Sequence, residues 1–508
     1  MKKIFYLFVI GLSILSISCS KDLNQIPISQ ATTLTFYQSP SDFVQAVNAA
    51  YCGLRGYPNR LLNLSEMRSD NIYGVSDLGV RDWDAVNDFQ KAGLVSNPYV
   101  TSAWNDNYNT IFRCNTVLEQ ITKNGSLINS ATLQARLQAE SQFIRAFSYF
   151  DLVKYFGKVP LIDHTVDPIE VNTIKQSPAA DIYKLIIADL QAAITNLPAS
   201  YTGVDVGRAT KYAAEGLLAQ VYMARSGATY GVEGPGLGLN EWSLALPLIQ
   251  DIINSGLFTF TPVFSDVFSY AKQNPTVNKE AVFDIMFLSG TNGYGASFPT
   301  VLISNDYFKT LGDTKSNGNL ENIPVSYDLI GKYAATDKRL LFTIHTAPYT
   351  SVAGSIVSNK PFFQKYVDFT KLASLLNSSD WGINFIAIRY TDILMMKAEC
   401  ILNGAPGTQA DVDAIVNQVR TRAGVPTMTN VTLAQLFDER RREFADEGSR
   451  WFDLQRSGNL VTIMNAWIAV DDATRKLMNP VVAGFVVYPV PQSQLDATPG
   501  LYTQNTGY

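Results

Sequence analysis

Residues 439–456 read ERRREFADEGSRWFDLQR, the most heavily charged stretch of the chain. Its acids include Glu439, Glu443, Asp446 and Glu447, and its bases include Arg440, Arg441, Arg442 and Arg450. A glycosidase needs two carboxylates facing each other across a sugar, about 5 to 9 Å apart, one of them with a raised pKa. Glu439 and Glu443 instead fall on one face of a helix, and neighbouring arginines keep acids ionised. The pattern therefore favours a structural role for this stretch over catalysis.

Helical periodicity extends outward from this stretch. Apolar spacing predicts helices over residues 392–402, 409–423 and 433–446. Towards the N-terminus it predicts further helices, with apolar stripes that begin at Phe43, Trp104, Leu133, Ile182, Tyr212 and Trp242. Short loops between such helices favour antiparallel pairs that resemble tetratricopeptide units, although no fixed repeat of about 34 residues is present.

The pattern of residue types changes between about residues 231 and 388. Glycine-rich runs interrupt the helices there, while residues 257–260 and 281–287 are rich in strand-forming side chains. The predicted fold class is mainly α: tetratricopeptide-like helix pairs, then an irregular, loop-rich second half that contains short β-strands. We expect an N-terminal helical part over 41–230 and a C-terminal part over 231–508, with a loop-rich insertion at 231–388. Binding residues tend to lie on such insertions.

Eight short segments, taken in their order along the chain, give a further indication of fold and function. They are residues 143–147, 155–161, 209–214, 388–399, 416–424, 439–456, 488–491 and 504–508. Taken together they resemble the SusD/RagB family of outer-membrane nutrient-binding lipoproteins of the Bacteroidetes. The resemblance implies a mostly α, tetratricopeptide-like fold, an oligosaccharide as the usual cargo, and a TonB-dependent transporter of the SusC type as partner, over which the protein sits as a lid.

The N-terminal residues indicate export and lipidation. A basic start is followed by an uncharged apolar run that ends at Ile17 and is too short to cross a bilayer, so residues 1–18 are predicted to be a signal peptide. Cys19, which follows the small Ser18, is the predicted lipid-attachment site, and residues 19–40 would be the tether. A plain signal peptide with an incidental cysteine is the alternative. The preferred interpretation places the protein on the cell surface, anchored by lipid in the outer membrane.

Composition argues against several classes of function. The formal net charge is −5 and no block of five or six like charges occurs, so no nucleic-acid partner is expected. Cys52, Cys114 and Cys400 lie in apolar helical contexts and are predicted to be buried. His164 and His345 have no neighbouring residues at metal-ligand spacing. We therefore predict no metal, no cofactor and no catalytic residue.

Aromatic and polar side chains in two loop regions are the candidate ligand-binding residues. An aromatic face can stack on a sugar ring while Asp, Asn or Arg side chains bond its hydroxyls. The candidates are Asp70, Asn71, Tyr73, Arg81 and Trp83 in the first region, and Tyr294, Phe298 and Trp381 in the second. For each of them, packing in the core or against a partner protein is the alternative.

The leading hypothesis is a lipid-anchored glycan-binding protein that captures oligosaccharides and delivers them to a transporter, without chemistry. One alternative is a lid of the same transporter type that takes peptides or another nutrient. Another is an enzyme that acts on polysaccharide through acids such as Asp70 and Asp82. The last is a purely structural lid whose aromatic residues contact only the transporter.

Overall fold

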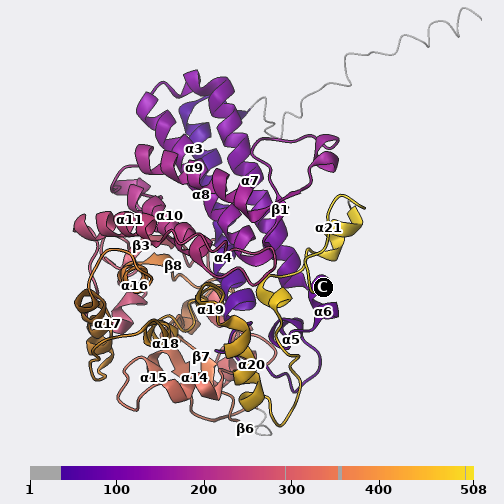
Figure 1. Ribbon diagram of the computed structural model, residues 1–508, viewed down its shortest axis with the longest axis vertical. Helices are drawn as coiled ribbons and strands as arrows, with labels where there is room; N and C mark the ends of the chain where they lie inside the picture. Colours follow the sequence, from indigo (N-terminus) through magenta and orange to yellow (C-terminus); the bar gives the residue numbers. More distant parts are fainter. Residues whose placement is uncertain (1–35, 292, 353–356, 498) are drawn as a thin grey trace, which may run out of the picture.

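A stack of helices forms the larger part of the molecule (Figure 1). The computed structural model describes residues 36–508 except 292, 353–356 and 498; the predicted signal peptide 1–18, Cys19 and the tether up to residue 35 lie outside the described residues. The stack comprises α3 (Pro40–Gly53), α7 (Pro98–Asn124), α8 (Ala131–Phe156), α9 (Ala179–Asn196), α10 (Lys211–Ser226), α11 (Trp242–Asn254), α16 (Tyr390–Leu402) and α17 (Gln409–Ala423). Each helix of this series packs on the one before it. The chain is about 53% helical, which confirms the predicted mainly α fold.

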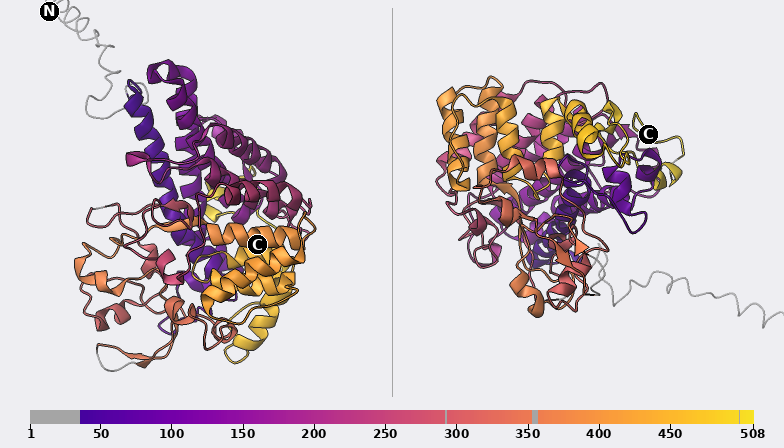
Figure 2. Two further views of the ribbon diagram at one scale, coloured as in Figure 1. Left: turned by 90° about the vertical axis from the view of Figure 1, so that its left-hand side faces the viewer. Right: turned by 90° about the horizontal axis from the view of Figure 1, so that it is seen from below.

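A loop-rich lobe leaves the stack after α11 and returns at α16. Its neck is the antiparallel pair of β3 (Ala281–Ile285) and β8 (Phe385–Arg389). The other elements of the lobe are α12 (Phe264–Val267), η7 (Phe298–Thr300), α13 (Asn305–Thr310), α14 (Tyr327–Lys332), α15 (Leu340–Thr343), β4 (Ile344–His345), β5 (Tyr349–Thr350), β6 (Val357–Ser358), β7 (Phe362–Phe363) and η8 (Phe369–Ser374). Strand β4 pairs with β7, and β5 pairs with β6. The left view of Figure 2 shows the lobe beside the C-terminal helices.

The remaining elements are short or follow α17. They are η2 (Leu54–Gly56), α4 (Tyr57–Arg60), the π-helical turn η3 (Leu61–Glu66), α5 (Asp82–Asn87), α6 (Lys91–Val95), η4 (Gly125–Ile128), β1 (Val159–Pro160), η5 (Glu170–Thr173), β2 (Gln176–Ser177), η6 (Gly203–Asp205), α18 (Leu433–Glu443), α19 (Arg450–Ser457), α20 (Leu460–Asp471), η9 (Ala483–Val486) and α21 (Gln492–Ala497). Strands β1 and β2 pair antiparallel. Within residues 36–508, as far as they are described, no helix has the length and apolar character needed to span a bilayer.

The C-terminal segment runs back onto the N-terminal helices. The hydroxyl of Tyr488 donates to the carbonyl of Leu64 at 2.6 Å, and Nδ2 of Asn505 donates to the carbonyl of Phe156 at 2.8 Å. The guanidinium of the buried Arg68 lies 4.0 Å from the centroid of the Tyr488 ring. These contacts place the end of the chain between the first helices, and one hydrophobic core therefore joins the N-terminal helices to the C-terminal segment.

The predicted strand over residues 257–260 was wrong. The segment runs beside residue 279, and the amide of Thr259 donates to the carbonyl of Lys279 at 3.0 Å. The next donor, the amide of Thr261, bonds instead to the side chain of Glu280 at 2.9 Å. Because a carboxylate takes the place of a backbone carbonyl, the strand ladder does not continue, and side-chain propensity alone gave no sign of this.

The predicted burial of the three cysteines was right for two of them. Cys114 and Cys400 are buried, whereas Cys52 is exposed. The buried side of α3 carries Phe43 and Val47, and Cys52 falls on the opposite side of the helix. The apolar residues next to Cys52 in the sequence therefore did not show on which side of the helix it lies.

The neck of the lobe contains an acid that is unusual for a buried strand. Asp284 of β3 is buried, and Nδ2 of Asn384 donates to its carboxylate at 2.7 Å. Burial raises the pKa of Asp284 to about 7, against the opposing effect of the Asn384 bond. The folded state therefore holds a proton that the unfolded state releases above about pH 4, so this group's contribution to stability falls as the pH rises towards 7.

Asp284→Asn is expected to stabilise the protein increasingly as the pH rises. The gain in unfolding free energy should be about 2–3 kcal/mol larger at pH 8 than at pH 5, because each unit of pKa is worth about 1.4 kcal/mol. Urea denaturation at both pH values measures this difference. Asp181→Asn, at a side chain that is 48% exposed, controls for loss of a charge. An equal gain for Asp284→Asn at both pH values would contradict the prediction.

Candidate functional site

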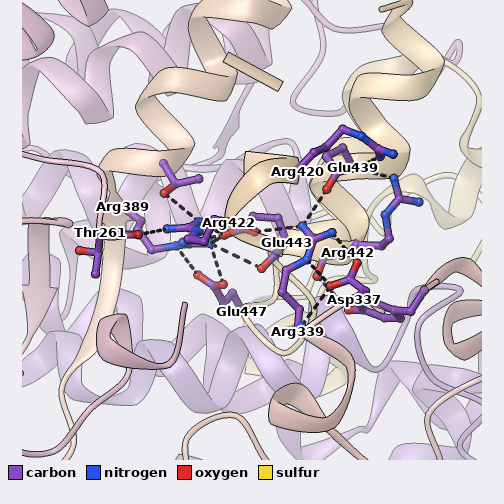
Figure 3. A network of polar contacts seen from close by, with 12 residues as sticks. Thr261, Asp337, Arg339, Arg389, Arg420, Arg422, Glu439, Arg442, Glu443 and Glu447 are labelled. Carbon is purple, nitrogen blue, oxygen red and sulfur yellow. Dashed lines mark hydrogen bonds and ion pairs between the residues drawn. The ribbon is translucent and has the colours of Figure 1, made fainter. Parts of the chain in front are cut away.

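The charged stretch at 439–456 forms part of a buried network of ion pairs (Figure 3). Glu443 lies at its centre and accepts hydrogen bonds from Arg422 at 2.6 Å and from Arg389 at 2.9 Å. Arg339 donates to the same carboxylate at 3.1 Å. The side chains of Glu443 and Arg339 are 0% exposed. Glu443 therefore lies inside the molecule with three arginine partners.

The protonation of Glu439 and Glu443 fits a structural role. Burial by itself raises the pKa of Glu443, but the arginines around it, Arg422 foremost, lower it to about 2. Burial also opposes ionisation of Glu439, yet Arg339 and Arg442 hold its pKa below the usual value. A catalytic general acid needs the opposite shift. The two carboxylates join arginines from separate segments of the chain, and the geometry supports the structural interpretation of this stretch.

Asp70 and Asn71, two of the predicted ligand-binding residues, belong to this interior. Arg450 donates to the Asp70 carboxylate through Nε and Nη2, both at 2.8 Å. Arg441 donates to Oδ1 of Asn71 at 2.8 Å. Burial raises the pKa of Asp70, but Arg441 and Arg450 lower it to about 2. With both side chains buried, Asp70 and Asn71 in this structure hold the N-terminal helices to C-terminal arginines and are closed to a ligand.

The other candidates of the first loop region lie nearer the surface. Tyr73 is half-buried, and its hydroxyl donates to Asp472 at 2.7 Å. Arg81 is also half-buried and donates to Glu321 at 3.2 Å. Trp83 is 3% exposed and lies under the Arg81 guanidinium. The structure therefore does not bring the five candidates of this region onto one open face, and we revise the expectation of a ligand surface formed by all of them.

The candidates of the second loop region divide in the same way. Trp381 is fully buried, and its Nε1 donates to Oδ1 of Asn317 at 2.9 Å. Phe298 is 1% exposed. Tyr294, in contrast, is 54% exposed, with the guanidinium of Arg55 5.6 Å from its ring centroid. Of these three, Tyr294 has a face available to a ligand.

A polar groove of about 410 Å³ lies beside the loop that carries Tyr294. Helical segments line one side with Asn59, Arg60, Asn63, Tyr99, Ser102 and Asp106. The lobe lines the other side with Ser297, Thr300, Asn319, Ser378 and Ser379. A hydrogen bond of 3.0 Å from Asn59 to Ser297 joins the two sides. The groove therefore forms where the lobe packs against the start of the helical stack.

Polar side chains line the groove, and two of their buried atoms have no hydrogen-bond partner. Among the described residues, Oδ1 of Asn59 and Nη1 of Arg60 lack a hydrogen-bond partner, although this Nη1 lies 3.8 Å from Asp106. Burial raises the pKa of the half-buried Tyr99 to about 12, so its hydroxyl stays protonated at neutral pH and can donate. An aromatic side chain flanked by amide and hydroxyl groups suits a polyhydroxylated ligand. In the part of the chain that the structure describes, no group of three His, Cys, Asp or Glu side chains could hold a metal ion.

The helical side of this groove was not predicted from the sequence. Tyr99, Ser102 and Asp106 are spaced three and four residues apart, so they share one face of α7. The apolar stripe that identified this helix, which includes Trp104 and Ile111, lies on another face. This polar face with its aromatic residue could therefore have been recognised in the sequence as an exposed helix surface. It did not show that the lobe, encoded far along the chain, would pack opposite this face.

Two family models match the chain. The model described as SusD family matches residues 343–508, and the model described as starch-binding associating with outer membrane matches residues 29–223. Among curated relatives, SusD-like protein P2 of Formosa agariphila is 27% identical, over 90% of this chain and 91% of its own. The starch-binding protein SusD of Bacteroides thetaiotaomicron is 23% identical, over 73% of each chain.

Solved structures show the same fold. Surface glycan-binding protein A from Bacteroides thetaiotaomicron, in complex with laminarihexaose, has a TM-score of 0.74 at 23% identity and covers 92% of this chain and 99% of its own. A SusD superfamily protein from Parabacteroides distasonis has a TM-score of 0.74 at 21% identity, with coverage of 94% and 100%. The helical stack and its lobe are therefore a recurrent architecture.

Proposed function

Because this chain belongs to the SusD/RagB family, we propose that it is a glycan-binding lipoprotein of the outer membrane that captures oligosaccharides at the cell surface. The observation that carries the proposal is the groove beside Tyr294, whose lining combines the Tyr99 ring with amide, guanidinium and hydroxyl side chains. The names of the relatives, which refer to starch and laminarin, support a saccharide as ligand.

The proposal includes an anchor and a partner. Lipid on Cys19 would hold the protein at the outer membrane, as the apolar run before it suggests. A TonB-dependent transporter of the SusC type would receive the bound glycan, as the family resemblance implies. The description of the family model that matches residues 29–223 supports the membrane association.

The composition of the groove favours a saccharide over a peptide. A peptide ligand is commonly held as an added strand against an exposed sheet edge. The described lining of this groove consists of helical and loop residues instead. Its charged side chains, Arg60 and Asp106, balance each other, so the groove suits a neutral ligand that bonds through hydroxyls.

The same lining favours binding without cleavage. Hydrolysis of a glycosidic bond generally uses two carboxyl groups, one on each side of the bond. Among the described residues that line the groove, Asp106 is the only acid. Burial raises the pKa of Asp106, opposed by Arg60, but no second carboxylate faces it across the groove. We therefore propose that the glycan leaves the groove intact.

Tyr99→Ala is expected to weaken glycan binding by at least about tenfold, because it removes the aromatic side chain of the groove. Calorimetry and affinity electrophoresis against starch, laminarin, xylan, mannan and galactan, with a peptide mixture in parallel, identify the ligand and measure the loss. The exposed Tyr327→Ala is the matched control, since Tyr327 lies outside the groove and is 68% exposed. Binding of peptides but no glycan, or release of new reducing ends from a bound glycan, would overturn the proposal.

A further inference from the structure

We propose, on the basis of the glycan-binding function above, that a second groove continues the binding path and that the protein therefore reads the length of a saccharide chain. This second groove has a volume of about 760 Å³ and lies within the lobe. It is larger than the first groove, and its lining residues are distinct from those of the first.

The second groove has the same kind of lining as the first. Half-buried rings of Tyr270, Phe342 and Phe369 contribute aromatic surface. The hydroxyls of Ser265, Ser269 and Ser289 also line it, and none of them bonds to another described residue. Rings and free hydroxyls in one groove suit a sugar chain rather than a purely apolar ligand.

The charges of the second groove select a neutral occupant. Asp266 is paired with Lys272 at 2.7 Å, and Asp368 and Lys371 of the lining offset each other. Lys365 is already bonded to the buried Glu447 at 2.9 Å, so it is not free to bind an anion. A polyanionic glycan or a nucleic acid would therefore find no net positive charge here.

A narrow ridge separates the two grooves. Its two segments, residues 288–297 without 292 and residues 375–382, are joined by backbone bonds between Ala296 and Trp381, of 2.7 and 3.2 Å. The carboxylate of Asp380 fastens both segments, since it accepts from the amides of Gly290 and Leu376. The buried Trp381 anchors the ridge from below. The ridge is therefore a defined part of the fold, with one groove on each side of it.

The ridge is short enough for one saccharide chain to cross. Ser379 lines the first groove and Gly382 lines the second. They are three positions apart in the chain, so their Cα atoms lie at most about 11 Å apart. The exposed side chains of the ridge include Tyr294 at 54% and Leu376 at 51%. A chain that fills the first groove can thus pass over an aromatic ring and enter the second groove.

Two variants test the second groove. Phe369→Ala removes one of its rings, and Ser265→Trp obstructs it from an exposed position without removing a core side chain. Ser126→Trp, at an exposed position on η4, is the matched control for the bulky substitution. Malto-, laminari-, xylo-, manno- and galacto-oligosaccharides of rising length, each with its parent polysaccharide, serve as probes in calorimetry with the full chain.

The wild-type protein is expected to bind long chains about tenfold or more tightly than short ones, because the second groove adds contacts within one complex. Both groove variants should lose this increment and keep the affinity for short chains, whereas Ser126→Trp should behave as wild type. Equal affinity at all lengths, or variants that retain the increment, would overturn the second groove and leave glycan binding intact. No binding of any probe at any length would overturn the proposed function itself.

Discussion

Glu443→Gln is expected to lower the free energy of unfolding by about 3–5 kcal/mol, because it leaves buried arginines without their shared counter-charge. The carboxylate accepts from Arg422, Arg389 and Arg339, with bonds between 2.6 and 3.1 Å. The glutamine keeps the volume of the side chain and removes its charge, so the loss reports on the ion pairs and not on a cavity. Urea denaturation followed by circular dichroism measures it.

The control for this prediction is an ion pair at the surface. Asp251→Asn breaks the pair with Lys211, in which both side chains are partly exposed at 49% and 32%. Such pairs contribute about 1 kcal/mol or less. If Glu443→Gln and Asp251→Asn shift the denaturation midpoint equally, the network around Glu443 does not hold the fold in the way we infer.

The pH dependence of stability gives a second readout of the same carboxylate. The pKa of Glu443 falls from its ordinary value of 4.5 to about 2 in the folded state. A depressed folded pKa contributes stability that is complete above about pH 4.5 and is lost as the pH falls towards 2. This contribution amounts to about 3 kcal/mol. Acidification from pH 5 to pH 2.5 should therefore destabilise the wild type more than Glu443→Gln.

The helical part of the fold was predictable because its signal is local. Apolar spacing around Phe43, Ile182 and Trp242 needs only neighbouring residues, and each of these stripes became a helix in the stack. The segment 257–260 has strand propensity too, but a strand also needs a partner with free backbone groups. Glu280 occupies that position with its side chain, and no local pattern shows this.

The candidate site was less predictable because burial of a loop residue depends on distant partners. Asp70 resembles a ligand-binding acid in sequence, yet its partner Arg450 lies 380 residues further along the chain. The formation of the groove also depends on residues that are distant in the chain. Tyr99 on α7 faces Ser297 and Ser379 of the lobe across it, and only the fold places these segments opposite each other. The residue types indicated the chemistry of the site. The positions of its side chains, in contrast, depend on how the folded chain packs.

Trp381→Ala is expected to lower the free energy of unfolding by about 3–5 kcal/mol and to weaken glycan binding at the same time. Removal of a buried tryptophan leaves a cavity as well as an unpaired partner, in this case Oδ1 of Asn317. The ring also packs near Tyr270 and Phe308, with centroids 6.5 and 6.3 Å away. Because Trp381 anchors the ridge between the two grooves, its loss disturbs both of them.

Tyr294→Ala is the comparison that separates an anchoring aromatic residue from a ligand-facing one. Its ring is 54% exposed, so the change should alter stability by about 0.5 kcal/mol or less, mainly through the lost contact with Arg55. Affinity for a long glycan should still fall by about tenfold, because a chain crossing the ridge loses its stacking surface. Thermal denaturation and calorimetry on both variants distinguish the two roles. A Trp381→Ala protein with wild-type stability and no glycan binding would instead place that ring against the ligand, as the sequence first suggested.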